Sequence, residues 1–230
     1  MRKPVVDYRK FRFSKLNTPD FSHLWLLIGW IAYFLLYTAT EILIPADRCH
    51  VVYSPIDDLI PFCEYFIVPY VLWYLLIAGS LLYFALYSIE NFKRLQIFII
   101  VTQIVAMFIY IVFPSRQDLR PVLDDLGRDN FFTEVVRVLY TIDTNTNVCP
   151  SLHVGYSIGI ASIWLKEKSA AWWVKLLLVS FCVLVCFSTA FVKQHSVIDT
   201  FVAIPMCLLA EIIACKSYWK EKFKKISSHH

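Results

Sequence analysis

The stretch "LQIFIIVTQIVAMFIYIVF" (residues 95–113) contains no charged side chain and is followed at once by Pro114. A helix needs about 20 predominantly apolar residues to cross the hydrocarbon core of a bilayer. The stretch has this length and composition, and proline disfavours continuation of a helix. It therefore predicts a transmembrane helix that ends at the proline.

Five further apolar segments lie on either side of this one. They are 22–44, 66–89, 151–165, 170–192 and 196–215. The whole chain is 58% hydrophobic and 17% charged, whereas a soluble domain has about 25% charged residues. None of the segments alternates as the strands of a membrane β-barrel do.

We therefore predict an all-α polytopic membrane protein, a six-helix bundle formed by residues 22–215 between basic tails at 1–21 and 216–230. The segment 151–165 is short for a membrane span, so we expect it to begin beneath the membrane surface.

Lysine and arginine are distributed unevenly between the two sides of the predicted bundle. Both tails and the short connections at 90–94 and 166–169 are rich in them, and the opposite connections contain fewer. The positive-inside rule then places both termini in the cytoplasm. The basic residues are accounted for by orientation in the bilayer, so a nucleic-acid partner is not predicted.

The connection between the third and fourth segments is long for a simple hairpin, which suggests a functional or capping role. Part of it, "NFFTEVVRVLYTID" (130–143), has apolar residues at helical spacing. This pattern predicts an amphipathic helix on the membrane surface.

The seven cysteines divide between the spans and the outer loops. Cys182, Cys186, Cys207 and Cys215 lie in or at the ends of spans, where a cysteine is usually a small core residue. Cys49, Cys63 and Cys149 lie in outer loops, where oxidation is possible and three pairings stay open. No Cys-x-x-Cys pair occurs, so a structural zinc site is not expected. No other metal or cofactor is predicted.

Two stretches place histidine at the outer end of an apolar segment. In "CPSLHVG" (149–155), Pro150 suits a helix start, and the N–H groups of Ser151, Leu152 and His153 would face outward as an anion site. In "KQHSVIDT" (193–200), His195 and Asp199 are four residues apart and share a helix face.

The pairing of His195 with Asp199 has a chemical consequence. A carboxylate that accepts the Nδ1–H of an imidazole leaves Nε2 free as a nucleophile. An unpartnered carboxylate within a membrane span costs about 2.5–3.5 kcal/mol, which favours the pairing.

Basic side chains accompany the two histidines on the predicted outer side. "FPSRQDLRP" (113–121) contains Arg116 and Arg120, and Lys193 immediately precedes the second histidine stretch. Guanidinium groups suit phosphate oxygens. Together these groups suit a dianionic phosphate and its transfer.

The same residues resemble a known family. "RP" (120–121), "PSLH" (150–153) and "STAFVKQHSVID" (188–199) look like the three signature motifs of the type-2 phosphatidic acid phosphatase superfamily, in order and spacing. The resemblance implies His195 as the nucleophile, His153 as the acid for the leaving group, and Asp199 as the group that orients His195. It also implies that Arg120 and Ser151 bind the phosphate.

Two positions depart from the family pattern. Phe113 stands where the family has lysine in the first motif, and Thr189 stands where it has arginine in the third. Lys193 and Arg116 are candidates to replace these cations. The "SLH" and "KQH" variants are similar to the branch of inositol-phosphorylceramide synthase-like transferases.

The resemblance implies an enzyme that hydrolyses a lipid phosphomonoester or pyrophosphate through a phosphohistidine, with its site facing the extracytoplasmic side. A site at membrane depth is reached most easily by a molecule already in the bilayer, so we expect a lipid substrate. The alternatives are transfer of a phospho-headgroup to a hydroxyl acceptor, and a transporter or non-catalytic membrane protein. Asp143 and Asn147 are expected to order a loop or shape the substrate mouth, and Glu41 has no assigned role.

Overall fold

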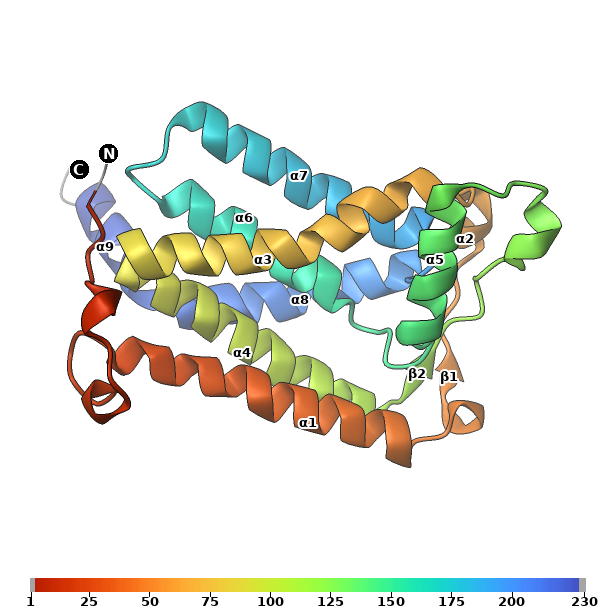
Figure 1. Cartoon of the computed structure of the whole chain (residues 1–230), viewed down its shortest axis with the longest axis horizontal. Coiled ribbons are helices and arrows are strands. Elements are labelled where there is room, and N and C mark those ends of the chain that lie inside the picture. The colour runs from red at the N-terminus through yellow and green to blue at the C-terminus, as the bar shows by residue number, and fades with distance from the viewer. Residues whose placement is uncertain (1–2, 228–230) are drawn as a thin grey trace.

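A computed structural model describes residues 3–227, and most of them are helical (Figure 1). Six helices run along the bundle: α1 (Ile28–Leu43), α3 (Ile67–Tyr87), α4 (Ile89–Val112), α6 (Leu152–Lys166), α7 (Trp172–Phe191) and α8 (Val197–Ala214). The other α-helices are α2 (Pro55–Leu59), α5 (Phe131–Ile142) and α9 (Lys216–Ser227). Short 3-10 helices cover Tyr8–Lys10, Phe13–Lys15, Ser22–Leu27, Ala46–Arg48, Glu64–Phe66 and Leu123–Leu126.

Five helical segments within residues 3–227 are long and apolar enough to cross a membrane. They are Ser22–Leu43, Glu64–Tyr87, Ile89–Val112, Trp172–Phe191 and Val197–Ala214. Large apolar side chains project outward from them, for example Leu35 (69% exposed) and Leu177 (63% exposed). Such an extensive apolar surface is stable in contact with lipid and not in contact with water. The chain is therefore an integral membrane protein built as an all-α bundle.

One predicted boundary is wrong. The third span was expected at 95–113 with a connection at 90–94, but α4 begins at Ile89, and Ser88 alone separates it from α3. Glu90 and Arg94 are four residues apart on the first turns of α4 and form an ion pair there. A membrane helix can therefore include charged residues at its end, and it is then longer than the apolar stretch from which it is predicted.

The segment predicted as a short fourth span is the central helix of the bundle. With 15 residues, α6 is about 22 Å long, which is less than the roughly 30 Å of a hydrocarbon core. It packs against α3, α4, α7 and α8, and its side chains at Ile160 and Ile163 are completely buried. A helix enclosed by others does not itself need to match the bilayer thickness.

Close packing of α6 depends on glycine. A Cβ atom added at Gly159 would lie 2.5 Å from the Phe98 ring of α4. We expect Gly159→Ala to lower the free energy of unfolding by about 1–3 kcal/mol, because an overpacked core must shift. Thermal unfolding in detergent micelles measures this effect.

The matched control is Gly79→Ala on α3, where an added Cβ meets nothing within 4 Å. It should be neutral or stabilise by up to about 1 kcal/mol, since alanine favours helix. Equal melting temperatures for the two variants would contradict the packing assigned to Gly159.

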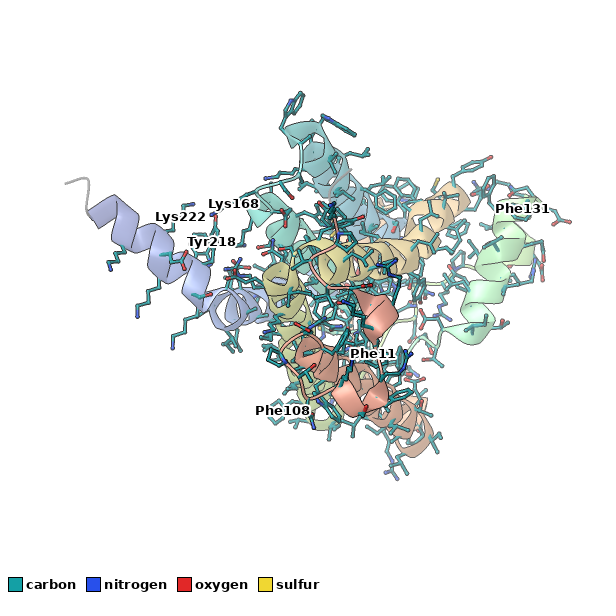
Figure 2. All side chains as sticks on the ribbon, turned by 60° about the vertical axis from the view of Figure 1, so that its left-hand side comes forward. Phe11, Phe108, Phe131, Lys168, Tyr218 and Lys222 are labelled. Carbon is teal, nitrogen blue, oxygen red and sulfur yellow. The ribbon has the colours of Figure 1, made fainter. Side chains whose placement is uncertain are left out.

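The two ends of the bundle differ. The N-terminal 3-10 helices and α9 lie at one end, and α2, α5 and two short strands lie at the other (Figure 1). Figure 2 shows α9, which carries Tyr218 and Lys222, extending away from the bundle. Residues 228–230 of the predicted C-terminal tail, and residues 1–2 of the N-terminal tail, lie outside the described residues.

The end opposite α9 is closed by α5 and a small sheet. The predicted amphipathic helix is present as α5 and lies across the end of the bundle (Figure 1), with Val136 buried against Ile67 and Tyr70 of α3. Strands β1 (His50–Val51) and β2 (Ser115–Arg116) pair in parallel, and Arg116 also bridges to Thr146. The sheet thereby anchors the loop that leads from α5 to α6.

Candidate functional site

The start of α8 builds the first half of the site. Ser196 caps the helix, and Asp199 Oδ2 accepts hydrogen bonds from the Ser196 backbone N–H (3.1 Å) and from His195 Nδ1 (3.1 Å). The pair is buried, with His195 8% and Asp199 0% exposed. Because Nδ1 is used by the carboxylate, Nε2 of His195 is the nitrogen left for a substrate.

The first turn of α6 supplies the second half. The ring of His153 is stacked on Tyr70 and packs against the tilted ring of Trp73, with ring centroids 4.4 and 4.1 Å away. Its Nε2 is buried and has no hydrogen-bond partner among residues 3–227. The ring centroids of His153 and His195 are 5.6 Å apart, so the fold brings the two predicted histidines together.

Ser151 is completely buried and acts as the N-cap of α6. Its Oγ accepts the Val154 N–H at 3.4 Å, and its own N–H donates to the Asp199 carbonyl at 3.2 Å. This N–H, which was expected to face outward, instead joins the start of α6 to the start of α8. The N–H groups of Leu152 and His153 have no partner within the helix, so the positive end of α6 remains beside the two imidazoles.

Arg120 lies near the site but its donors are used within the protein. Nη1 donates to the Tyr140 carbonyl (3.2 Å), Nη2 donates to the carbonyls of Asp143 (2.8 Å) and Thr144 (2.7 Å), and Nε donates to Gln194 Oε1 (3.1 Å). These contacts hold the C-terminal end of α5 next to Gln194, the residue that precedes His195. Arg120 therefore connects the loop after α5 to the loop before α8.

We expect Arg120→Gln to lower the free energy of unfolding by about 2–3 kcal/mol, because several hydrogen bonds from a charged donor are lost together. The melting temperature in detergent measures it. Arg137→Gln is the control, since Arg137 is 41% exposed and pairs with Asp124 and Glu134 at the surface, where ion pairs contribute little. If Arg120→Gln left the melting temperature unchanged and raised the KM for the lipid phosphate, Arg120 would bind the phosphate as predicted from the sequence.

Lys193 and Arg116 are also directed away from the two histidines. Lys193 has a φ of +54°, and its Nζ donates to the carbonyls of Asp57 (2.7 Å) and Ile60 at the end of α2. Burial lowers the pKa of Lys193, and the charge of Asp57 opposes this shift. Arg116 pairs with Asp118 (3.2 Å) beside the small sheet.

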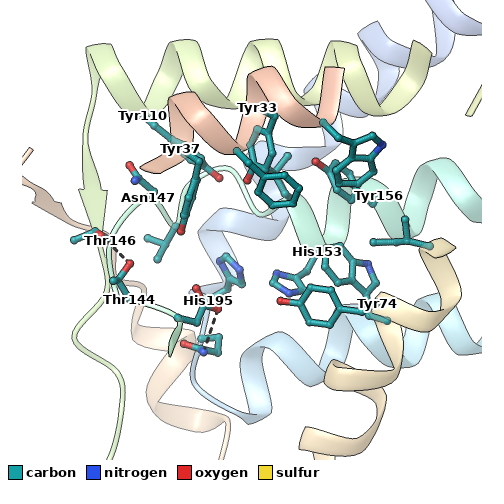
Figure 3. A pocket seen from close by; sticks show the side chains of 18 of the residues that line it. Tyr33, Tyr37, Tyr74, Tyr110, Thr144, Thr146, Asn147, His153, Tyr156 and His195 are labelled. Carbon is teal, nitrogen blue, oxygen red and sulfur yellow. Dashed lines mark hydrogen bonds between the residues drawn. The ribbon is translucent and has the colours of Figure 1, made fainter. Parts of the chain in front are cut away.

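A cavity of about 400 Å³ opens beside the two histidines, between α1 and α3. Its wall is rich in aromatic residues, from Trp30, Tyr33, Phe34 and Tyr37 on α1, Trp73 and Tyr74 on α3, Tyr110 on α4 and Tyr156 on α6. Polar residues gather at the end that contains His195, namely Asp143, Thr144, Thr146, Asn147 and Gln194. Figure 3 shows Tyr33 and Tyr37 entering the cavity from α1 and Tyr74 from α3, with both histidines near them.

Asp143, expected to shape the substrate mouth, lines this cavity at the end of α5. Its Oδ2 accepts hydrogen bonds from the Tyr70 hydroxyl (3.1 Å) and from Gln194 Nε2 (3.4 Å). Burial raises the pKa of Asp143, and the nearby His195 opposes the shift. Neither Tyr70 nor Gln194 was predicted in this role, because an apolar-span tyrosine and a loop glutamine carry no local signal.

Two further carboxylates hold the loops around the cavity. Asp57 accepts hydrogen bonds from the Ser196 hydroxyl (2.6 Å) and the Val197 N–H (2.8 Å), and so positions the start of α8. The S-x-x-D pattern at Ser54 is a capping-box signal, but it does not reveal this remote contact. Glu41, left without a role by the sequence, accepts from Thr144, Thr146 and Asn147 and so ties α1 to the loop after α5.

Within the described part of the chain, the cysteines and the acidic residues form no second reactive site and no metal site. All seven cysteines are free thiols, including the outer Cys49, Cys63 and Cys149. Burial raises the pKa of Cys149 to about 12, which makes its thiolate a minor species. No group of three or more His, Cys, Asp or Glu residues in 3–227 is placed to hold a metal ion.

Comparisons with protein-family models, with curated proteins and with solved structures give no match for this chain.

Proposed function

We propose that this membrane protein is a metal-independent enzyme that cleaves a phosphate ester of a lipid through a phosphohistidine on His195. The observation that supports this most directly is the meeting of two imidazoles, 5.6 Å apart between ring centroids, at the wall of one cavity. One imidazole is oriented by a carboxylate and the other has a buried, unpartnered nitrogen. A nucleophile oriented by a neighbouring base is the usual pattern of covalent catalysis.

The chemistry divides between the two histidines. His195 Nε2 attacks phosphorus and forms a P–N bond while the P–O bond to the lipid breaks. His153, protonated, gives its proton to the departing oxygen and then takes one from the water that attacks the phosphohistidine. Asp199 stabilises the positive charge that develops on His195, and the N-terminal end of α6 favours the phosphate oxygens.

A lipid substrate is supported by the surroundings of the cavity. The cavity lies between two helices of the apolar bundle, and Ile77, Ala78 and Leu81 of α3 extend its wall away from the polar end. An acyl chain could occupy that part while the phosphate meets the histidines. The end of α5 and the start of α8, next to which the polar lining residues lie in the chain, are at the end of the bundle opposite α9 (Figure 1). The positive-inside distribution therefore supports an extracytoplasmic site and cytoplasmic termini.

Transfer to a hydroxyl acceptor is the second candidate. Thr144, Thr146 and Asn147 line the cavity on the side of His195 (Figure 3). Their side-chain donors are used by Glu41, but their side-chain oxygens can accept a hydrogen bond from the hydroxyl of an acceptor. In that case a lipid or polyol hydroxyl replaces water in the second step. A non-catalytic or transport role remains the alternative to both.

A panel of lipid phosphates incubated with purified protein tests the proposal. We expect turnover that survives a chelator and is inhibited by orthovanadate, because imidazoles supply both attack and protonation. Free phosphate or phospho-headgroup identifies hydrolysis, and a new phospholipid formed with an added acceptor identifies transfer. Lack of turnover on every member, or an absolute need for a divalent cation, would contradict the proposal.

A further inference from the structure

The cavity contains a carboxylate where a phosphate site would be expected to contain cations. None of its lining residues within 3–227 is Lys or Arg, and Asp143 is its acidic member. The guanidinium of Arg120 is engaged by Tyr140, Asp143 and Thr144 carbonyls, and Lys193 is engaged by α2. The positive hydrogen-bond donors left for the ligand are therefore the imidazoles and the helix N-terminus, and the charge of Arg120 acts on the cavity without direct contact.

This charge pattern distinguishes between classes of phosphate ester. A phosphomonoester dianion beside Asp143 meets a like charge in surroundings that screen it poorly. A phosphodiester carries one negative charge at phosphorus, and an ammonium group in its headgroup can pair with the carboxylate. Asp143 uses the same oxygen, Oδ2, for Tyr70 and Gln194, so its hydrogen bonds leave Oδ1 uncommitted.

The aromatic wall adds a second, independent preference for a cation. Tyr37 on α1 and Tyr74 on α3 line the same cavity as Asp143, and Figure 3 shows them entering it from opposite helices. Aromatic faces attract quaternary and primary ammonium groups. An aromatic wall with one carboxylate is the surface that such a group requires.

We infer that the lipid cleaved at this site is a zwitterionic phosphodiester whose ammonium headgroup is bound by Asp143 between the cavity tyrosines. This inference rests on the proposed function. Gln194 connects the proposed headgroup site to the proposed phosphate site, because its side chain bonds Asp143 and its backbone directly precedes His195. Because Asp143 and His195 line one cavity and are linked through Gln194, we expect a short arm between phosphate and nitrogen, as in choline or ethanolamine.

The reaction follows the scheme above with the headgroup retained on the enzyme. His195 Nε2 bonds to phosphorus, the P–O bond to the lipid alcohol breaks, and His153 protonates that alcohol. Water then attacks phosphorus and the P–N bond breaks. The amino-alcohol phosphate is released, and the proton from water returns to His153.

The test compares a phosphatidylcholine with a phosphatidic acid of the same acyl chains in non-ionic micelles. We expect the wild type to cleave the choline lipid at least 10-fold more efficiently. Asp143→Asn should lower kcat/KM for the choline lipid at least 10-fold and raise it for phosphatidic acid, because attraction and repulsion are removed together. Opposite changes on two substrates cannot come from partial unfolding.

Asp125→Asn, which removes the same charge from an exposed position, is the control and should leave the preference unchanged. If Asp143→Asn does not fold, wild-type inhibition by phosphocholine and by inorganic phosphate provides the test, and phosphocholine should bind at least 10-fold more tightly. A wild-type preference for phosphatidic acid, equal losses on both lipids in Asp143→Asn, or tighter binding of inorganic phosphate overturns the inference. Loss of all turnover in His195→Ala tests the proposed function separately.

Discussion

His195→Ala is expected to reduce turnover of the lipid phosphate by about 10⁴-fold or more, because removal of a covalent nucleophile abolishes the intermediate. The variant should fold, since the imidazole makes one side-chain hydrogen bond, to Asp199, and the Ser196 N–H still meets that carboxylate. Two measurements check the expectation: the rate of product release, and trapping of labelled phosphorus on the protein. A phosphohistidine is identified by stability in base and lability in acid.

The control for this variant is His50→Ala. His50 lies on β1, stacked on Phe113 with ring centroids 4.3 Å apart and outside the cavity lining. Its loss should leave turnover within about threefold of wild type. Full activity in His195→Ala, or a trapped phosphoryl group that survives the substitution, would remove His195 from the role of nucleophile.

His153→Gln is expected to give the second-largest loss, about 10²–10⁴-fold on a lipid alcohol leaving group, which is the usual contribution of a general acid. The loss should depend on the leaving group. A p-nitrophenyl ester of the same phospho-headgroup releases a phenol acidic enough to leave without a proton, so its turnover should fall less than about tenfold. Glutamine preserves most of the volume between Tyr70 and Trp73.

The ratio of the two losses separates the roles open to His153. Equal losses on the lipid and on the p-nitrophenyl ester would mean that His153 binds phosphate or supports packing instead of protonating the leaving group. The stability of the variant, measured by thermal unfolding in micelles, shows whether the buried stack has been disturbed. The wild-type enzyme on both substrates supplies the reference ratio.

The sequence predicted a hydrogen bond between His195 and Asp199 from their spacing, and the structure contains this bond. His195 and Asp199 were predicted to share a face of the last helix, but α8 begins at Val197 and His195 precedes its N-cap, Ser196. Their hydrogen bond forms where the chain turns into the helix, between residues only four positions apart. The amphipathic helix within 115–150 was predicted for a similar reason, since its period is a property of consecutive residues. Most span limits agree with the helices within a few residues for the same reason.

The basic residues show where such reasoning fails. Arg120, Lys193 and Arg116 were grouped with the phosphate because of charge and shared side, but each donates to a backbone carbonyl of a segment distant in the chain. Long, flexible side chains can reach any acceptor within several ångströms. Helix ends offer unpaired carbonyls in quantity, and sequence does not reveal which helix end lies nearby.

The amino-acid order alone was enough to establish a helical membrane protein, its approximate spans, and an imidazole–carboxylate pair at the start of its last span, because hydropathy and the spacing of neighbouring residues are local properties. Assembly of the bundle was needed to enclose α6, to bring His153 to His195, and to place Asp143 rather than a lysine or arginine at the wall of the cavity. Those outcomes depend on contacts between distant segments, such as the hydrogen bonds of Asp143 with Tyr70 and Gln194. Their geometry is set by how helices pack and by which polar groups remain unpaired where they meet.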